Sequence, residues 1–237
     1  MDTSNFKFLI LKRLLKTITI FYFIWIILSG SIEYAYMIWN VILAWVPLEI
    51  VLLIDRINSK IHKKDWLKIV IIFLWILWLL FYPNSSYIIT DFIHLPNEYH
   101  IINPNYSPYS NEARIIFNDD IEIWLDFINI GIGVWIGYVV GFISLYISQH
   151  SFASKHNNII SWIFVSMVHI LTGFAIYIGR FNRWNSWDVI FNPANIITIL
   201  RSSFNSKAIK FTFLFGIFSF TLYIISYILV EIAKERR

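Results

Sequence analysis

The chain contains no cysteine and few charged residues, and these two shortages narrow the class of protein. Without cysteine there is no disulfide, no thiolate zinc site and no thiol nucleophile. Charged residues make up only 14% of the 237 residues, whereas 58% are hydrophobic. A soluble domain could not bury that much apolar surface, so the composition predicts a polytopic membrane protein whose main partner is the lipid bilayer.

Six apolar stretches are candidates for membrane-spanning helices. They predict an all-α fold with one transmembrane domain over residues 1–237. The predicted spans are residues 14–29, 37–54, 67–82, 121–148, 159–179 and 210–230. The second and third are short for a hydrocarbon core of about 30 Å, which favours a tilted or re-entrant arrangement there.

The distribution of lysine and arginine predicts the orientation of these spans. Basic residues gather before the first span, after the second span and at the C-terminus. By the positive-inside rule, both termini are then cytoplasmic, and the loops 83–120 and 180–209 are extracytoplasmic. We therefore expect a protein of the cytoplasmic membrane. Nucleic acid is not an expected partner, because the basic residues flank membrane spans and do not gather on a domain.

The two long outer loops differ in their expected structure. Residues 96–120 are rich in proline, asparagine, serine and tyrosine, which predicts irregular structure that covers a site. In the other loop, the spacing of Asn185 and Asp188 resembles a capping box, so a short helix is expected to begin there. Residues 194–205 have the apolar pattern of a helix that lies along the membrane interface.

The segment from Asn84 to Leu95 ends the third span and carries ionisable residues next to the membrane. On a helical wheel, its polar and apolar residues fall on opposite sides. The polar arc consists of Asn84, Tyr87, Thr90, Asp91 and His94. Because ionisable groups at membrane depth are costly, they indicate a functional site.

Asp91 and His94 are neighbours three residues apart on such a helix. A carboxylate beside a histidine orients the imidazole, and the two can act as a base or as a pair of ligands. Two neighbouring ligands are too few to predict a metal site. The alternative is a polar interfacial face in which Asp91 caps a helix or pairs with an arginine.

Arg180 and Arg183 depart from the positive-inside pattern, because they lie at the outer end of the fifth span. Guanidinium groups bind phosphate or carboxylate with paired hydrogen bonds, so both residues are candidate anion ligands. The alternative is a structural network of ion pairs with Asp91, Asp126 or Asp188.

These residues form the predicted site, to which the sequence assigns no metal or cofactor. The candidate catalytic residues are Asp91, His94 and Asp188. The candidate substrate-binding residues are Asn84, Arg180, Arg183, Asn185 and Asp126.

Two further patterns support other functions. His169 and Glu49 lie within predicted spans, where polar groups line the pathway of a transporter. An intramembrane histidine also commonly bonds to a neighbouring helix. Gly133, Gly137 and Gly141 are spaced by four residues and predict a helix face that admits another helix closely. That face could also contact a partner subunit.

Three motifs carry a resemblance to a known family. They are Trp39-Asn40-Val41-Ile42-Leu43-Ala44-Trp45-Val46-Pro47, Tyr82-Pro83-Asn84-Ser85-Ser86-Tyr87-Ile88-Ile89-Thr90-Asp91-Phe92-Ile93-His94-Leu95 and Gly179-Arg180-Phe181-Asn182-Arg183-Trp184-Asn185-Ser186-Trp187-Asp188. The chain resembles a bacterial multi-pass membrane family classified as domain of unknown function 1361. Ser86 departs from the proline or small residue expected there. The resemblance implies a bacterial membrane location. It also supports the hypothesis that the second and third motifs, both predicted on the outer side, form one site. It implies no activity.

The leading hypothesis is a site that binds or processes an anionic, phosphate-bearing envelope or lipid-linked molecule. In it, Arg180 and Arg183 hold the anion, and Asn84 and Asp188 orient the reacting groups. If a reaction occurs, hydrolysis or group transfer fits these residues best. The alternatives are a small-solute or proton-coupled transporter and a non-catalytic membrane scaffold, so the sequence leaves open whether the protein is an enzyme.

Overall fold

The computed structural model describes residues 3–29, 34–58, 65–95, 99–109, 111–184, 186, 188, 194 and 196–236. The chain divides into two compact units by its internal contacts. Unit 1 comprises Met1–Val41 and Ile88–Ile136, and unit 2 comprises Ile42–Tyr87 and Gly137–Arg237. The helices Ala35–Asn58 and Ile121–Ala153 therefore each contribute to both units.

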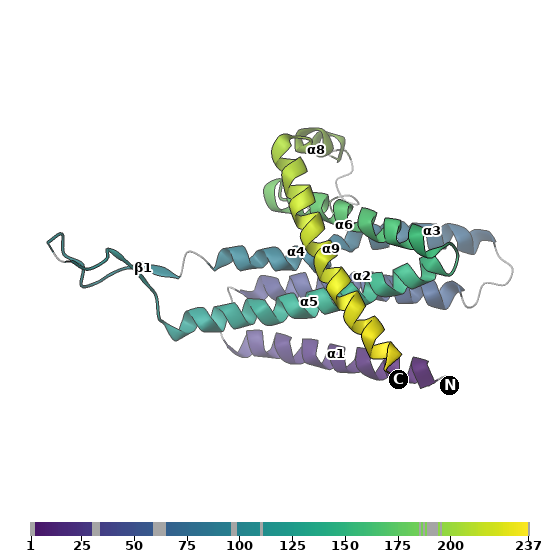
Figure 1. The fold of residues 1–237 in the computed structure, drawn as a ribbon, viewed down its shortest axis with the longest axis horizontal. Coiled ribbons are helices and arrows are strands. Elements are labelled where there is room, and N and C mark those ends of the chain that lie inside the picture. The colour runs from purple at the N-terminus through teal and green to yellow at the C-terminus, as the bar shows by residue number, and fades with distance from the viewer. Residues whose placement is uncertain are drawn as a thin grey trace. The chain divides into compact units, whose positions relative to one another are not determined.

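Most of the described residues are helical (Figure 1). This confirms the predicted all-α class. The elements are, in chain order, α1 (Thr3–Leu28), α2 (Ala35–Asn58), α3 (Asp65–Phe81), α4 (Pro83–Tyr87), the 3₁₀ helix η2 (Ile88–His94), the strands β1 (His100–Ile102) and β2 (Ile115–Phe117), α5 (Ile121–Ala153), α6 (Asn158–Phe181), α8 (Ile196–Ser203) and α9 (Ser206–Glu235).

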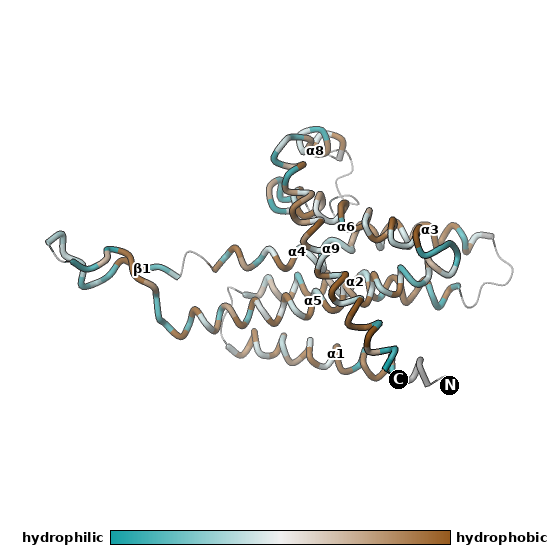
Figure 2. Tube along the Cα trace, in the orientation of Figure 1, coloured by the Kyte–Doolittle hydropathy of each residue, from teal (hydrophilic) through white to brown (hydrophobic). Residues whose placement is uncertain are grey.

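Five segments of the described chain are long and apolar enough to cross a membrane, so the protein has the character of a multi-pass membrane protein. They comprise α2, α5, α6, α9 and the combined segment Trp66–His94. These helices are mainly hydrophobic along their length, and hydrophilic residues occur at the C-terminal end of α9 (Figure 2). The predicted first span lies in α1, which is not among the five and carries four basic residues among its first 14. That α1 also spans the membrane stays a prediction.

Unit 1 is held together by hydrogen bonds that join α1 to α5. The Trp25 indole N–H donates to the Asn129 side-chain oxygen over 2.8 Å, and the Tyr22 hydroxyl donates to the Asn129 carbonyl over 2.8 Å. One helical turn further along α5, a Cβ at Gly133 would overlap the side chains of Met37 and Tyr22. The glycine lets these side chains lie directly against the backbone of α5.

The loop between η2 and α5, in unit 1, differs from the irregular structure that its composition predicts. It contains a two-stranded antiparallel sheet in which His100 pairs with Phe117 and Ile102 pairs with Ile115. The stacked rings of Tyr99 and Phe117, 6.2 Å apart, support this pairing. Figure 1 shows that the hairpin extends beyond the start of α5. Hydrogen bonds between the two strands thus pair backbone N–H and C=O groups in a segment whose many turn-forming residues predicted only a loop.

Unit 2 is built around the close packing of α6 and α9. A Cβ at Gly173 would overlap the Thr212 carbonyl and the Gly216 backbone nitrogen. The two helices therefore meet backbone to backbone, as small residues permit. Elsewhere in this unit, Gly141 on α5 is packed against Ser85. Three glycines were predicted to form a contact face. At two of them, Gly133 and Gly141, the space beside the glycine is filled by side chains of the same chain.

Candidate functional site

The segment after α3 does not form the single amphipathic α-helix that its pattern predicts. It consists of the short α4 followed by the 3₁₀ helix η2. The 3₁₀ helix has three residues per turn, whereas the helical wheel assumed the 3.6 of an α-helix. The side chains therefore do not separate into the polar and apolar sides that the wheel predicts. The Asp91 side chain is 1% exposed and Ile93 is 68% exposed. Burial of the carboxylate is therefore a result of the packing, which the wheel did not predict.

Asn84 joins the end of α3 to the loop after α6, within unit 2. Its side-chain N–H groups donate to the Phe81 carbonyl over 2.9 Å and to the Ser186 hydroxyl over 3.2 Å. The Ser186 hydroxyl donates in turn to the Leu80 carbonyl over 3.0 Å. Phe81 and Leu80 are in the last turn of α3, whose carbonyls lack intrahelical donors. The two side chains satisfy them and fix the loop to the helix end.

Arg180 lies over the aromatic ring of Tyr87, with its guanidinium carbon 4.9 Å from the ring centroid. Tyr87 also approaches α6 at Gly179, where an added Cβ would come within 3.0 Å of the ring. Glycine therefore makes room for the tyrosine at the end of α6. Arg180 is half-buried and comes from the last turn of that helix.

Arg183 occupies a strained backbone position just after α6. Asn182 caps the helix, with its backbone N–H donating to the Ile178 carbonyl. The next residue, Arg183, has φ 54°, which is the left-handed conformation common directly after a helix cap and usually adopted there by glycine. For a residue with a Cβ this conformation costs about 1–2 kcal/mol. An arginine kept at a glycine position is a signal of function.

In unit 1, Asp91 accepts a hydrogen bond from the Asn40 side-chain N–H over 2.7 Å. Asn40 had no predicted role, although it belongs to the first of the three motifs. His94 is exposed and its ring meets the edge of the Tyr36 ring, 5.8 Å away. The two members of the predicted pair thus share η2 but have different environments, one buried and one exposed.

The remaining predicted site residues are distributed over the two units. Asp126 is half-buried on α5 in unit 1, and Asp188 is half-buried in unit 2. Asn185 lies outside the described residues, as does Trp187. Within the described part of the chain, the structure shows no group of three or more histidine, aspartate or glutamate side chains placed to hold a metal.

His169 is bonded to a neighbouring helix, which is the more common role of an intramembrane histidine. Its Nδ1 lies 2.9 Å from the Ser219 hydroxyl of α9, and the side chain is 2% exposed. The rings of Tyr82, Phe220 and Tyr223 surround it. The other ring nitrogen, Nε2, is buried and has no hydrogen-bond partner. Unpaired buried polar atoms are costly, so this nitrogen is a second candidate for function.

Comparison with known proteins shows that the chain matches the model of one protein family. The model of a family described as "Protein of unknown function (DUF1361)" matches residues 39–222, which is more than half of the chain. The match includes all three motifs. No curated protein and no solved structure matches the chain.

Proposed function

The chain belongs to the DUF1361 family of proteins of unknown function, and we propose that it binds an anionic, phosphate-bearing envelope or lipid-linked molecule at the end of α6. The binding groups are the guanidinium groups of Arg180 and Arg183. The charge distribution of the sequence predicts that this end of α6 is on the extracytoplasmic side, and the proposed location is a bacterial cytoplasmic membrane.

The contact between Arg180 and Tyr87 carries this proposal. The guanidinium group lies over the ring, so the side chain loses conformational freedom before any ligand arrives. The guanidinium group carries five N–H donors in a planar fork. These donors are the ones that match a phosphate with two parallel hydrogen bonds.

The surroundings of Arg180 support a prepared site. The Asn84–Ser186 hydrogen bond ties the segment that carries Tyr87 to the loop that follows Arg180. Arg183 supplies a second positive charge three residues along the chain, at a backbone position that favours glycine. Two cations three residues apart at the end of one helix suit a multiply charged group such as phosphate.

The proposal is tested by native mass spectrometry of gently purified protein. We expect a phosphorylated molecule to co-purify with the wild type and to be lost from Arg180→Gln/Arg183→Gln. Arg201→Gln is the matched control, because Arg201 is an exposed arginine on α8 of the same unit. If the wild type and the double variant retained the phosphorylated molecule equally, Arg180 and Arg183 would not be its binding groups. A bare protein in every case would favour the transporter or the scaffold.

A transporter is the second candidate, and the α6–α9 interface favours it. Three polar atoms there are buried without a hydrogen-bond partner: His169 Nε2, Thr172 Oγ1 and Thr212 Oγ1. Such atoms line pathways for protons or small polar solutes in membrane proteins. The test is proton flux into reconstituted vesicles, which His169→Ala should reduce. Undiminished flux in that variant would count against a route through His169.

A further inference from the structure

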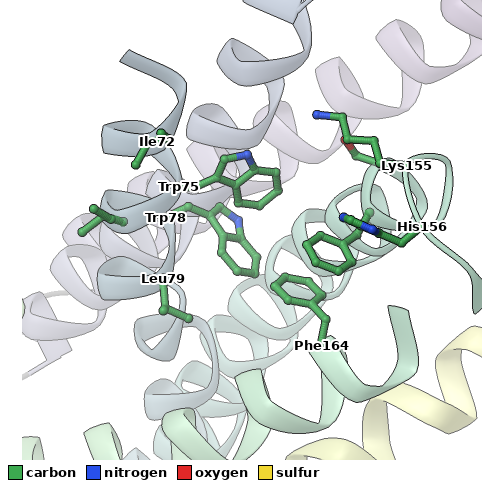
Figure 3. A pocket seen from close by; sticks show the side chains of 10 residues that line it. Ile72, Trp75, Trp78, Leu79, Lys155, His156 and Phe164 are labelled. Carbon is green, nitrogen blue, oxygen red and sulfur yellow. The ribbon is translucent and has the colours of Figure 1, made fainter. Parts of the chain in front are cut away.

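A cavity of about 360 Å³ lies in unit 2 between α3, the end of α5 and the start of α6 (Figure 3). Its walls are mainly aromatic and come from Trp75, Trp78, Phe152 and Phe164. Figure 3 shows Lys155 and His156 at one side, on the turn between α5 and α6, and Ile72 and Leu79 on the facing helix. The cavity thus combines an apolar interior with a basic edge.

The aromatic walls are fixed by contacts with one another. The rings of Phe152 and Phe164 are stacked at 4.8 Å, and those of Trp78 and Phe164 are stacked at 6.0 Å. Trp75 meets Trp78 edge to face at 5.5 Å. The Trp78 indole N–H donates to the Ser144 hydroxyl over 2.9 Å, so this polar atom is satisfied away from the cavity. The walls are therefore preformed and suited to an apolar chain.

The basic edge is formed by the turn that joins α5 to α6. The backbone N–H groups of Lys155 and His156 both donate to the Phe152 carbonyl, over 3.2 and 3.0 Å. Both side chains are exposed, and the His156 ring packs against Phe152 at 4.8 Å. Asp55 of α2 lies within electrostatic range of Lys155 and offsets part of its charge. The edge retains an ammonium group and an imidazole.

The cavity also borders the lipid-facing surface of α3. Ile72 and Ile76 are each 60% exposed, and Leu79 is 38% exposed. In a membrane-spanning helix, exposed apolar side chains of this kind face acyl chains. A ligand could therefore enter sideways from the bilayer and need not come from water.

We propose that this cavity binds an acyl chain of an anionic phospholipid, with the lipid phosphate at Lys155 and His156. The two ends of the cavity match the two ends of the lipid: aromatic walls for the chain, and basic side chains for the phosphate. Basic pockets between transmembrane helices bind anionic lipid headgroups by the same combination. An electrically neutral lipid would fill the apolar part but would gain less from the ammonium group.

This site is separate from the one at Arg180. The two lie at opposite ends of α6, which has 24 residues and is about 36 Å long. The lipid proposal therefore does not depend on the proposed function, and each can fail alone.

The test compares phosphatidylglycerol with phosphatidylcholine, added to delipidated protein and measured by native mass spectrometry. We expect tighter binding of phosphatidylglycerol by the wild type. Lys155→Gln/His156→Gln should weaken phosphatidylglycerol binding by about fivefold, the loss expected for one lysine charge, and affect phosphatidylcholine binding less. Ile76→Trp, which narrows the cavity from its exposed wall, should weaken both lipids.

A control makes the result specific. Lys68→Gln removes an exposed charge from the first turn of α3 without altering the cavity lining, and should leave the preference intact. Equal binding of the two lipids by the wild type would overturn the proposal. So would an unchanged preference in Lys155→Gln/His156→Gln.

Discussion

The guanidinium carbon of Arg180 lies over the Tyr87 ring, 4.9 Å from the ring centroid, in unit 2. The two residues come from different motifs and are separated by more than ninety positions. The contact explains why an arginine at the end of a membrane helix has one defined position. It also yields a direct test, because the ring can be changed while the arginine is kept.

Replacing Tyr87 with leucine should loosen Arg180. Tyr87→Leu removes the ring face and should cost about 0.5–2 kcal/mol of the cation–π interaction. Tyr87→Phe keeps the ring and should retain most of it. Thermal unfolding in detergent and the content of co-purified phosphorylated molecules measure the two effects. A Tyr87→Leu variant that matches Tyr87→Phe in both would show that the stacking has no energetic role.

Two substitutions of Arg183 should distinguish the effect of its backbone strain from the effect of its charge. Arg183→Gly relieves the left-handed conformation at φ 54° and should stabilise the protein by about 1 kcal/mol. Arg183→Gln removes the charge and keeps the strain, so its stability should remain near that of the wild type. If Arg183 binds the anion, both variants should lose ligand although only one gains stability. Full ligand retention in both would assign Arg183 a purely local role.

Substituting Gly173 should force α6 and α9 apart. The Cβ of Gly173→Ala would overlap the Thr212 carbonyl, which is backbone and cannot rotate away. We expect a loss of about 1–3 kcal/mol, measured by unfolding in detergent. Gly131→Ala is the matched control, since no atom lies within 4 Å of its added Cβ. It should be neutral or stabilising by up to about 1 kcal/mol. Equal effects of the two substitutions would contradict the close crossing.

Removing the Asn40 partner should destabilise unit 1 through Asp91. Asn40→Leu deprives a side chain that is 1% exposed of its 2.7 Å hydrogen bond, at a cost of about 1–3 kcal/mol. Asp91→Asn keeps an acceptor oxygen of the same shape and should be tolerated better. Denaturant or thermal unfolding distinguishes them. The role predicted for Asp91 in catalysis would then be examined in the stable Asp91→Asn variant.

The predicted topology can be tested with single cysteines, because the natural chain has none. Tyr109→Cys lies in the outer hairpin loop and Ser154→Cys lies between α5 and α6, both at exposed positions. An impermeant thiol reagent added to intact cells should label the first and spare the second. The reverse pattern would invert the orientation and move the Arg180 end to the cytoplasmic side.

Much of the helical framework follows from local sequence alone. Each predicted span falls largely within one long helix; for example, residues 159–179 lie within α6 (Asn158–Phe181). Long apolar runs must satisfy their backbone hydrogen bonds internally in a bilayer, so hydropathy is enough to locate helices. The family is likewise recognisable from its motifs, and the match to residues 39–222 confirms it.

Only the tertiary structure decided which side chains meet. The sequence indicated that Asp91, Arg180 and His169 were unusual, but their contacts with Asn40, Tyr87 and Ser219 join positions about 50 or more residues apart. Such contacts depend on how helices cross and on where glycine permits close approach, and no local pattern specifies either. The change from α to 3₁₀ geometry after Tyr87 had the same origin: packing buried Asp91 and exposed Ile93, against the local amphipathic pattern.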